Sequence, residues 1–533
     1  MTTTMLSTIG MIVVYILIML GIGFYTSRKT KSVSDFVLGG RTAGSWLTAF
    51  AYGTSYFSAV VFIGYAGQFG WNYGVSAAWI GVGNAVIGSL LAWVVLGRRT
   101  RIMTKHLGSK TMPEFFENRF QSKSLKIAAA AIVFVFLIPY TASVYNGLSR
   151  LFAMAFNLTS DTSYMVIIVA MALLTAVYVI LGGYAATAIN DFVQGLVMLA
   201  GIAAVVYSVI HNQGGFSSAL EGLKNIDTNG AKAGTLNTLF GPDPINLFGV
   251  VVLTSLGTWG LPQMVHKFYA IKDQDAVKKG TIISTVFALI VAGGSYLLGG
   301  FDRLFCTTDA ADASGKTLIA TLPNGKPEFD AMIPAVLQTA LPDLLIGLVV
   351  VLVLSASMST LSSLVLTSSS TLTIDMIKPA MKKTMSDKKE VTVMRILIGA
   401  FLLVSVLIAF NKTASISTLM SYSWGALAGA FLGPFMWGLF SKKVTKAAVW
   451  TSFATGIVGT VTHMCIFSFF SSSFPGLVKA AVSCPLNLAS PINAGAILML
   501  LSIIIVPVVS AFTKPCDQKA VDAVFACYDE KNA

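Results

Sequence analysis

Apolar blocks of about 20 residues recur along the whole chain, and this is the length at which an α-helix spans the hydrocarbon core of a bilayer. No water satisfies backbone N–H and C=O groups inside a bilayer, so such blocks must be helical. Strands of a membrane barrel would be about half as long and would alternate in polarity. Only 11% of the residues are charged, against roughly one quarter in soluble domains. We therefore expect an all-α polytopic membrane protein, and the composition excludes a soluble enzyme.

The apolar blocks predict about thirteen transmembrane helices. The first block has no basic residue before it and no small-residue cleavage pattern after it, so we expect a retained span and not a signal peptide. The expected spans are residues 7–27, 43–70, 74–97, 125–156, 163–183, 186–210, 245–270, 279–301, 344–375, 391–410, 415–440, 446–471 and 491–512.

The net charge of +13 is distributed unevenly among the predicted loops. Most of the 36 Lys and Arg residues fall in alternate loops, the pattern that the positive-inside rule assigns to the cytoplasmic face. We therefore expect the N-terminus outside and the C-terminus in the cytoplasm, in a plasma membrane that for a bacterium is the inner membrane. Lys267 is counted with the inner loop after the seventh span, and no Lys or Arg is expected in the middle of a span. This distribution reports topology and excludes a nucleic-acid partner.

The five cysteines form no CxxC pair and no other metal-binding spacing. Cys306 and Cys484 fall in loops on the same predicted side of the membrane. We favour free thiols, and a Cys306–Cys484 bridge is the alternative.

Two of the predicted spans are interrupted. The second contains Gly53 at the start of a small and hydroxyl-rich run, and the seventh contains Gly257, Gly260 and Pro262. Proline removes a backbone donor and glycine loosens a helix, so both spans are expected to be discontinuous. The alternative is that Gly and Pro are simply common in membrane helices.

Each interrupted span begins a block of five, spans two to six and seven to eleven. An odd number of spans inverts one block relative to the other, and paired interruptions in inverted repeats surround a central binding site. The expected organisation is a first span and inner loop (1–42), a first five-helix repeat (43–210), an outer loop (211–244), a second five-helix repeat (245–440), two accessory spans (441–512) and a tail (513–533). The outer segments 211–244 and 302–343 are expected to form short helices, or else plain connections.

The ninth predicted span carries a dense run of hydroxyls. Ser359, Ser362 and Ser363 are spaced i, i+3 and i+4, so they share one helix face, with Thr360 beside them. Hard cations prefer oxygen ligands, which favours a sodium site. The alternative is that these hydroxyls bond to their own helix or hold neighbouring helices together.

Asp191 lies about one turn inside the sixth predicted span. A carboxylate within the membrane is costly and therefore indicates a functional site. The alternative is a cap at the membrane interface.

These features together resemble the sodium/solute symporter family, which includes bacterial proline, pantothenate, sialic acid and sugar carriers. The resemblance runs from about residue 10 to residue 512. It rests on Gly182-Gly183 with Asp191 and Gln194, and on the stretches 272–280, 358–362, 421–426 and 433–434.

The resemblance implies a leucine-transporter-like inverted 5+5 repeat and one sodium ion, with a second in some members. The main sodium site would use the carbonyls of Thr54, Phe57 and Ala356 and the hydroxyls of Ser359 and Thr360. Position 54 departs from the family, in which Ala is usual, but a carbonyl ligand tolerates this. The second sodium would be held by Asp191, Ser359, Ser362 and Ser363.

The resemblance also implies a solute site lined by Tyr56, Ser58, Tyr140, Trp259 and Gln263. Tyr56 stands where proline carriers place an Asp, which argues against proline. Its surroundings are more similar to those of the pantothenate branch. The solute is expected to be a small organic molecule, either a monocarboxylate like pantothenate or an amino acid.

Sodium-coupled symport by a monomer embedded in lipid is thus expected, with no organic cofactor. Two alternatives remain open: a proton-coupled carrier that uses Asp191, and a transport-like membrane sensor. An enzyme is not expected, because no cluster of residues has catalytic spacing.

Overall fold

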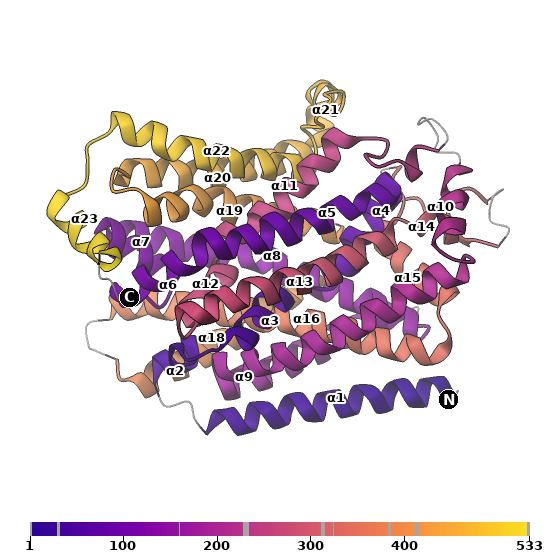
Figure 1. The fold of residues 1–533 in the computed structure, drawn as a ribbon, viewed down its shortest axis with the longest axis horizontal. Coiled ribbons are helices and arrows are strands. Elements are labelled where there is room, and N and C mark those ends of the chain that lie inside the picture. The colour runs from indigo at the N-terminus through magenta and orange to yellow at the C-terminus, as the bar shows by residue number, and fades with distance from the viewer. Residues whose placement is uncertain are drawn as a thin grey trace.

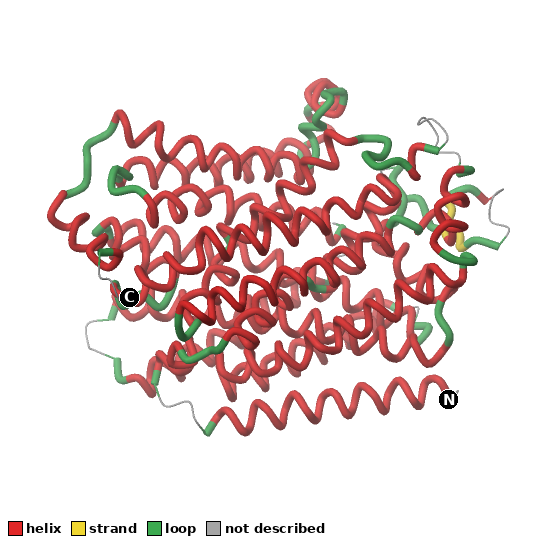
Figure 2. Tube along the Cα trace, in the orientation of Figure 1, coloured by secondary structure: helices red, strands yellow, loops and turns green. Residues whose placement is uncertain are grey.

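The computed structural model describes residues 3–28, 32–158, 160–226, 234–310, 315–322, 325–381, 385–410 and 415–529. Its long helices lie side by side in one bundle, with the two termini at opposite ends (Figure 1). Loops gather at the two ends of the bundle (Figure 2). The strands of the described part are β1 (Cys306–Thr307) and β2 (Thr317–Leu318), which pair in parallel.

The bundle is built from long helices that match the predicted apolar blocks. They are α1 (Thr3–Ser27), α3 (Ser45–Tyr56), α8 (Lys123–Ala155), α9 (Asp161–Asn212), α11 (Pro244–Gly260), α12 (Pro262–Ala270), α13 (Gln274–Gly299), α16 (Asp343–Thr371), α18 (Asp387–Ala409), α19 (Ile416–Phe440), α20 (Lys446–Met464) and α22 (Pro491–Phe512). Between α3 and α8 the chain passes through α4 (Ala66–Tyr73), α5 (Ala78–Gly83), α6 (Arg98–His106) and α7 (Met112–Phe120), with π-helical turns at Val60–Tyr65, Asn84–Leu91 and Trp93–Gly97.

Nine helices of the described residues are long and apolar enough to cross a membrane, or ten if one bent pair counts as a span. Two of the nine, Val60–His106 and Thr162–Asn212, have 47 and 51 residues. One crossing takes about 20 residues, so each is long enough for two. The all-α membrane class is confirmed, and the total of thirteen stays a prediction.

Helix α9 turns back on itself at Gly183, whose φ of 56° and ψ of −146° are open to glycine and strained for other residues. The hydroxyl of Tyr178 donates to the Met358 carbonyl at 2.7 Å. Gln194 donates at 2.8 Å to Tyr15, whose own hydroxyl contacts the Met358 sulfur. Sixteen residues of straight helix measure about 24 Å. The reversal brings Tyr178 to Met358 directly and Gln194 to the same residue through Tyr15.

Both predicted helix interruptions are confirmed. Helix α3 ends at Tyr56, Phe57 is extended (φ −99°, ψ 102°), and helical structure resumes at Val60. Helix α11 ends before Leu261 (ψ 122°), and α12 starts with Pro262 in its first turn, at a bend of 46°. Proline suits a first helical position because that N–H would be unbonded in any case.

The glycines beside these breaks allow close packing, and their expected loosening of the helix stays a prediction. A Cβ at Gly260 would lie 2.9 Å from the Ala428 backbone, and a Cβ at Gly257 would meet the Trp424 ring. Gly53 likewise faces the Phe287 ring with no room for a side chain. Pro262 lies directly at the break, while Gly257 and Gly260 allow α11 to approach α19.

Short helices gather at the two ends of the bundle (Figure 1). One end has α2 (Val33–Leu38), α6, α7 and α23 (Gln518–Phe525), beside most of the basic loops. The other end has α10 (Phe216–Lys224), α14 (Asp302–Phe305) and α15 (Met332–Ala340), which confirms the short helices expected within 211–244 and 302–343. The residues 227–233, 311–314 and 323–324 of those segments lie outside the described part. Which end faces the cytoplasm stays a prediction.

Neither Cys306 nor Cys484 forms a disulfide, which excludes the bridge between them. Cys306 is buried, with its sulfur 3.8 Å from the Met332 carbonyl, whereas Cys484 is half-buried, with its sulfur 3.4 Å from the Ala480 carbonyl of the preceding helix α21 (Pro475–Val482). Each of these two thiols contacts a backbone carbonyl and not the other cysteine.

Candidate functional site

The break in α3 leaves backbone carbonyls without helical partners beside α16. The N–H of Phe57 closes the last turn on the Gly53 carbonyl at 3.1 Å, and the chain then leaves the helix. The last carbonyls of a helix have no N–H ahead of them. The Thr360 hydroxyl lies against these carbonyls. Its Oγ1 atom is 3.4 Å from the carbonyl oxygens of Thr54 and Ser55 and 3.1 Å from that of Ala356. One hydroxyl therefore faces three carbonyl oxygens.

Ser359 stands next to this group of oxygens. Its Oγ lies 2.7 Å from Thr54 Oγ1 and 2.6 Å from Asp191 Oδ1. The Thr54 hydroxyl donates to the Phe50 carbonyl at 2.8 Å, so Ser359 is the donor toward both Thr54 and Asp191, and its single proton serves one of them at a time. Phe57 and Ala356 also line one small pocket together. The structure thus brings the predicted main-site residues to the junction of α3 and α16.

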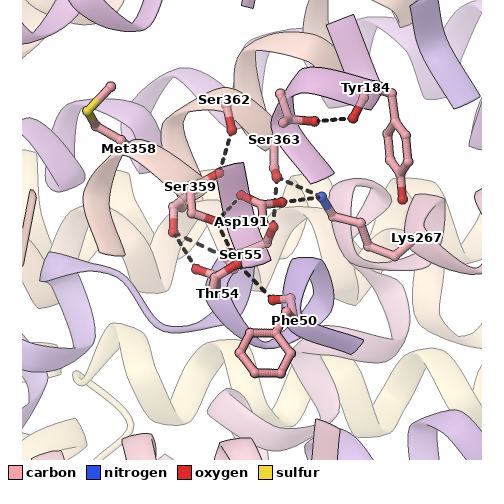
Figure 3. Close-up of polar contacts among 12 residues, drawn as sticks. Phe50, Thr54, Ser55, Tyr184, Asp191, Lys267, Met358, Ser359, Ser362 and Ser363 are labelled. Carbon is pink, nitrogen blue, oxygen red and sulfur yellow. Dashed lines mark hydrogen bonds and ion pairs between the residues drawn. The ribbon is translucent and has the colours of Figure 1, made fainter. Parts of the chain in front are cut away.

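Asp191 is fully buried in the interior of α9, so the alternative of an interfacial cap is wrong. Its Oδ2 atom lies 3.5 Å from the ammonium nitrogen of Lys267, which donates to Ser363 Oγ at 2.9 Å. Ser363 Oγ is in turn 2.7 Å from Ser55 Oγ. Figure 3 shows these side chains converging from α3, α9, α12 and α16.

The position of Lys267 corrects the expectation that no basic residue lies within a span. The residue is 2% exposed, and every residue of α12 is buried. Its place near the end of an apolar block suggested an inner loop, but α12 continues the broken span into the bundle. The signal that could have revealed it is the apolar sequence Phe268–Ile271 directly after the lysine.

The predicted second sodium set is brought together only in part. Ser359 contacts Asp191 directly and Ser363 is joined to it through Lys267, but the Ser362 hydroxyl donates to the Ser359 carbonyl of its own helix at 2.8 Å. This local bond is common for serine in helices. A second sodium at these residues stays a prediction.

Two of the predicted solute-site residues share one aromatic partner. The rings of Tyr56 and Tyr140 each lie 5.9 Å from the Trp424 ring, the first stacked and the second edge-on. The Tyr56 hydroxyl donates to the Thr254 carbonyl on α11. Trp424 was absent from the predicted set, although it lies in the stretch 421–426 that carried the family resemblance.

The other three predicted solute-site residues are Ser58, Trp259 and Gln263. Trp259 donates from Nε1 to the Ile87 carbonyl at 2.9 Å, and Ser58 Oγ accepts from the Val60 N–H at 3.2 Å, in the break of α3. Gln263 is 1% exposed, yet neither polar atom of its amide has a hydrogen-bond partner among the described residues. Buried amides are normally paired, so Gln263 marks a place where a ligand could bond.

Comparison with known proteins gives a consistent result. The sequence profile of the sodium:solute symporter family matches residues 36–459. A sodium/proline symporter of Salmonella typhimurium is 29% identical over 457 residues, covering 84% of this chain and 85% of that protein. A sodium/proline symporter of Staphylococcus aureus is 30% identical over 458 residues, covering 84% and 83%.

The fold is shared with a solved structure of a sodium-coupled sialic acid symporter in a substrate-bound, outward-open state. The TM-score is 0.71 at 17% identity, over 96% of this chain and 99% of that one. This likeness confirms the leucine-transporter-like fold. The chain is a multi-pass membrane protein and belongs to the sodium:solute symporter family, whose members couple solute transport to sodium.

Proposed function

We propose that this protein imports a small carboxylate-bearing solute, an amino acid in the first place, together with sodium bound at the junction of α3 and α16. The observation that carries the proposal is the pair of Thr54 and Ser55 carbonyl oxygens at the end of α3, which face the Thr360 hydroxyl, with the Ser359 hydroxyl beside them against Thr54 Oγ1. The proposed ligands are the carbonyls of Thr54, Phe57 and Ala356 and the hydroxyls of Ser359 and Thr360.

Sodium at this junction would stabilise one arrangement of α3 against α16. Coupling requires that an ion bind one conformational state more tightly than another, because only differential affinity shifts the equilibrium between states. A site built from two separate helices meets this requirement, since its ligands come together only when α3 and α16 are in contact. The proposed ligands are uncharged carbonyl and hydroxyl oxygens, so they bind sodium weakly enough for it to be released on the other side of the membrane.

The solute is proposed to bind between the aromatic cluster of Tyr56, Tyr140 and Trp424 and the start of α12. The N-terminus of α12 is the positive end of its helix dipole and lies at the break, with Gln263 in its first turn. An unpaired amide near a helix N-terminus suits a carboxylate. The sodium/proline symporters among the relatives make proline the first amino acid to test.

Thermal stability of the purified protein in detergent, with sodium or potassium as the only cation, tests the solute and the ion together. A screen of amino acids, small monocarboxylates and sugars should include one carboxylate-bearing compound that raises the melting temperature in sodium and not in potassium. Equal stabilisation in both salts would contradict sodium coupling, and a shift only with sugars would contradict the carboxylate class.

Uptake into proteoliposomes provides the second measurement. An inward sodium gradient should drive accumulation of the compound found by the screen. Accumulation driven by a pH gradient in sodium-free buffer would instead support the proton-coupled alternative that uses Asp191.

A further inference from the structure

The ammonium group of Lys267 lies among the residues that would otherwise hold a second sodium ion. We propose that this ammonium is a built-in cation that takes the place of the second sodium, so that the protein binds a single sodium ion per transport cycle. This inference rests on the proposed sodium site at α3 and α16, and it concerns only the neighbouring group of Asp191, Lys267 and Ser363.

The contacts of Lys267 are those of a bound cation. Its nitrogen lies 3.5 Å from Asp191 Oδ2 and 2.9 Å from Ser363 Oγ. The face of the Tyr184 ring is 5.4 Å away, within the range of a cation–π interaction. These partners come from α9 and α16, while the lysine comes from α12 (Figure 3). The ammonium therefore connects three helices, as a bound metal ion would.

The charge balance of this group leaves no place for a further cation. Among the described residues, Asp191 is the only carboxylate paired with Lys267, and Lys267 is the only cation paired with Asp191. One negative and one positive charge already cancel. A sodium ion beside them would put two cations against a single carboxylate in a buried, weakly screened environment, where repulsion is strong.

The oxygen ligands are also divided between other partners. Ser359 faces Thr54 and Asp191, and Ser362 donates to a carbonyl of its own helix. Ser363 accepts from Lys267 and contacts Ser55. A hard cation needs several oxygens at once, so the ammonium and the main site together use the ligands that a second sodium would need.

Equilibrium binding of radioactive sodium to the purified full-length protein, without any solute, tests the inference. The wild type should bind one sodium ion per chain with a Hill coefficient of one. Lys267→Met removes the ammonium but leaves Asp191 charged, so this variant should bind two sodium ions cooperatively. Lys267→Arg keeps a cation in place and should bind one.

Lys272→Met is the matched control, because this lysine lies just beyond α12 with an exposed side chain and should leave binding at one ion. Two sodium ions bound to the wild type, or one bound to a folded Lys267→Met protein, would overturn the inference. If Lys267→Met does not fold, the number of sodium ions bound per wild-type chain still tests the inference. Absence of any sodium binding to the wild type would instead overturn the proposed function.

Discussion

Single hydroxyl groups carry the proposed sodium site. Thr360 Oγ1 lies within 3.4 Å of three backbone carbonyl oxygens, and Ser359 Oγ joins this group to Asp191. A neutral hydroxyl can donate to a carbonyl when the ion is absent and turn its lone pairs to the ion when it is bound. The same atoms can therefore serve the site in both conditions.

Thr360→Ala should lower sodium affinity at least tenfold, the factor that about 1.4 kcal/mol of lost binding energy produces. The fold should lose only about 1 kcal/mol, the usual net value of one hydrogen bond. Radioactive sodium binding and thermal unfolding measure the two effects. Ser357→Ala is the matched control, because the Ser357 hydroxyl donates to the Val353 carbonyl of the same helix at 2.7 Å. Equal loss of sodium affinity in both variants would contradict the site.

Gln263→Leu should abolish the solute-dependent rise in melting temperature while sodium binding is kept. Without solute, the variant should be as stable as the wild type or more stable, because an unpaired buried amide is removed. Gln194→Leu gives the contrast. Its amide donates to Tyr15 at 2.8 Å, so this variant should be less stable. A clear destabilisation by Gln263→Leu would mean that the amide has a structural partner.

At the scale of elements, the break after α3 and the break between α11 and α12 expose polar groups in the centre of the bundle. The end of α3 presents carbonyl oxygens, while the start of α12 presents the positive end of its helix dipole and the Gln263 side chain. A cation and an anion can thus be bound near one another by backbone dipoles of opposite sign. Close contact between α11 and α19 holds the second break in place, and glycine makes that contact possible.

Gly260→Ala should destabilise the protein by about 1–3 kcal/mol, the usual cost of overpacking, because the new Cβ would lie 2.9 Å from the Ala428 backbone. Gly293→Ala in α13 is the control. A Cβ there meets no atom within 4 Å, and alanine is the better helix former by about 1 kcal/mol. Thermal unfolding in detergent should therefore separate the two variants. A stable Gly260→Ala protein would show that α19 can move away.

At the scale of the whole molecule, charge and architecture agree. The short helices beside most of the basic loops lie at one end of the bundle, and the N-terminus lies at the other (Figure 1). Helix α23 packs at the basic end, where Lys442 pairs with Asp522 at 2.7 Å and the Tyr528 hydroxyl donates to the Arg99 carbonyl. The positive-inside rule assigns this end to the cytoplasm.

Cysteine labelling in whole cells tests that orientation. In a variant without native cysteines, Ser483→Cys should react with a membrane-impermeant maleimide in intact cells. Lys514→Cys should react only after the membrane is permeabilised. Both positions are exposed, so accessibility to water does not distinguish them. The reverse pattern would invert the predicted topology.

The class of fold and the run of hydroxyls at the proposed sodium site could be predicted from the sequence for local reasons. Apolar block length predicts membrane helices, Pro262 predicts the second break, and the i, i+3, i+4 spacing places the serines on one face. Asp191 stands out because a carboxylate within an apolar block is costly. Each of these properties depends on residues close together in the chain.

Tertiary structure alone decided what each polar group meets. The pairing of Lys267 with Asp191, the shared contact of Tyr56 and Tyr140 with Trp424, and the packing role of Gly260 join segments far apart in the sequence. From the sequence alone, a lysine near the end of an apolar block is assigned to a loop unless the position of its carboxylate partner is known. The sequence by itself thus determined which helices form and where they break. The packing of those helices decided that the Lys267 ammonium lies against Asp191, because that depends on which charges share one buried space.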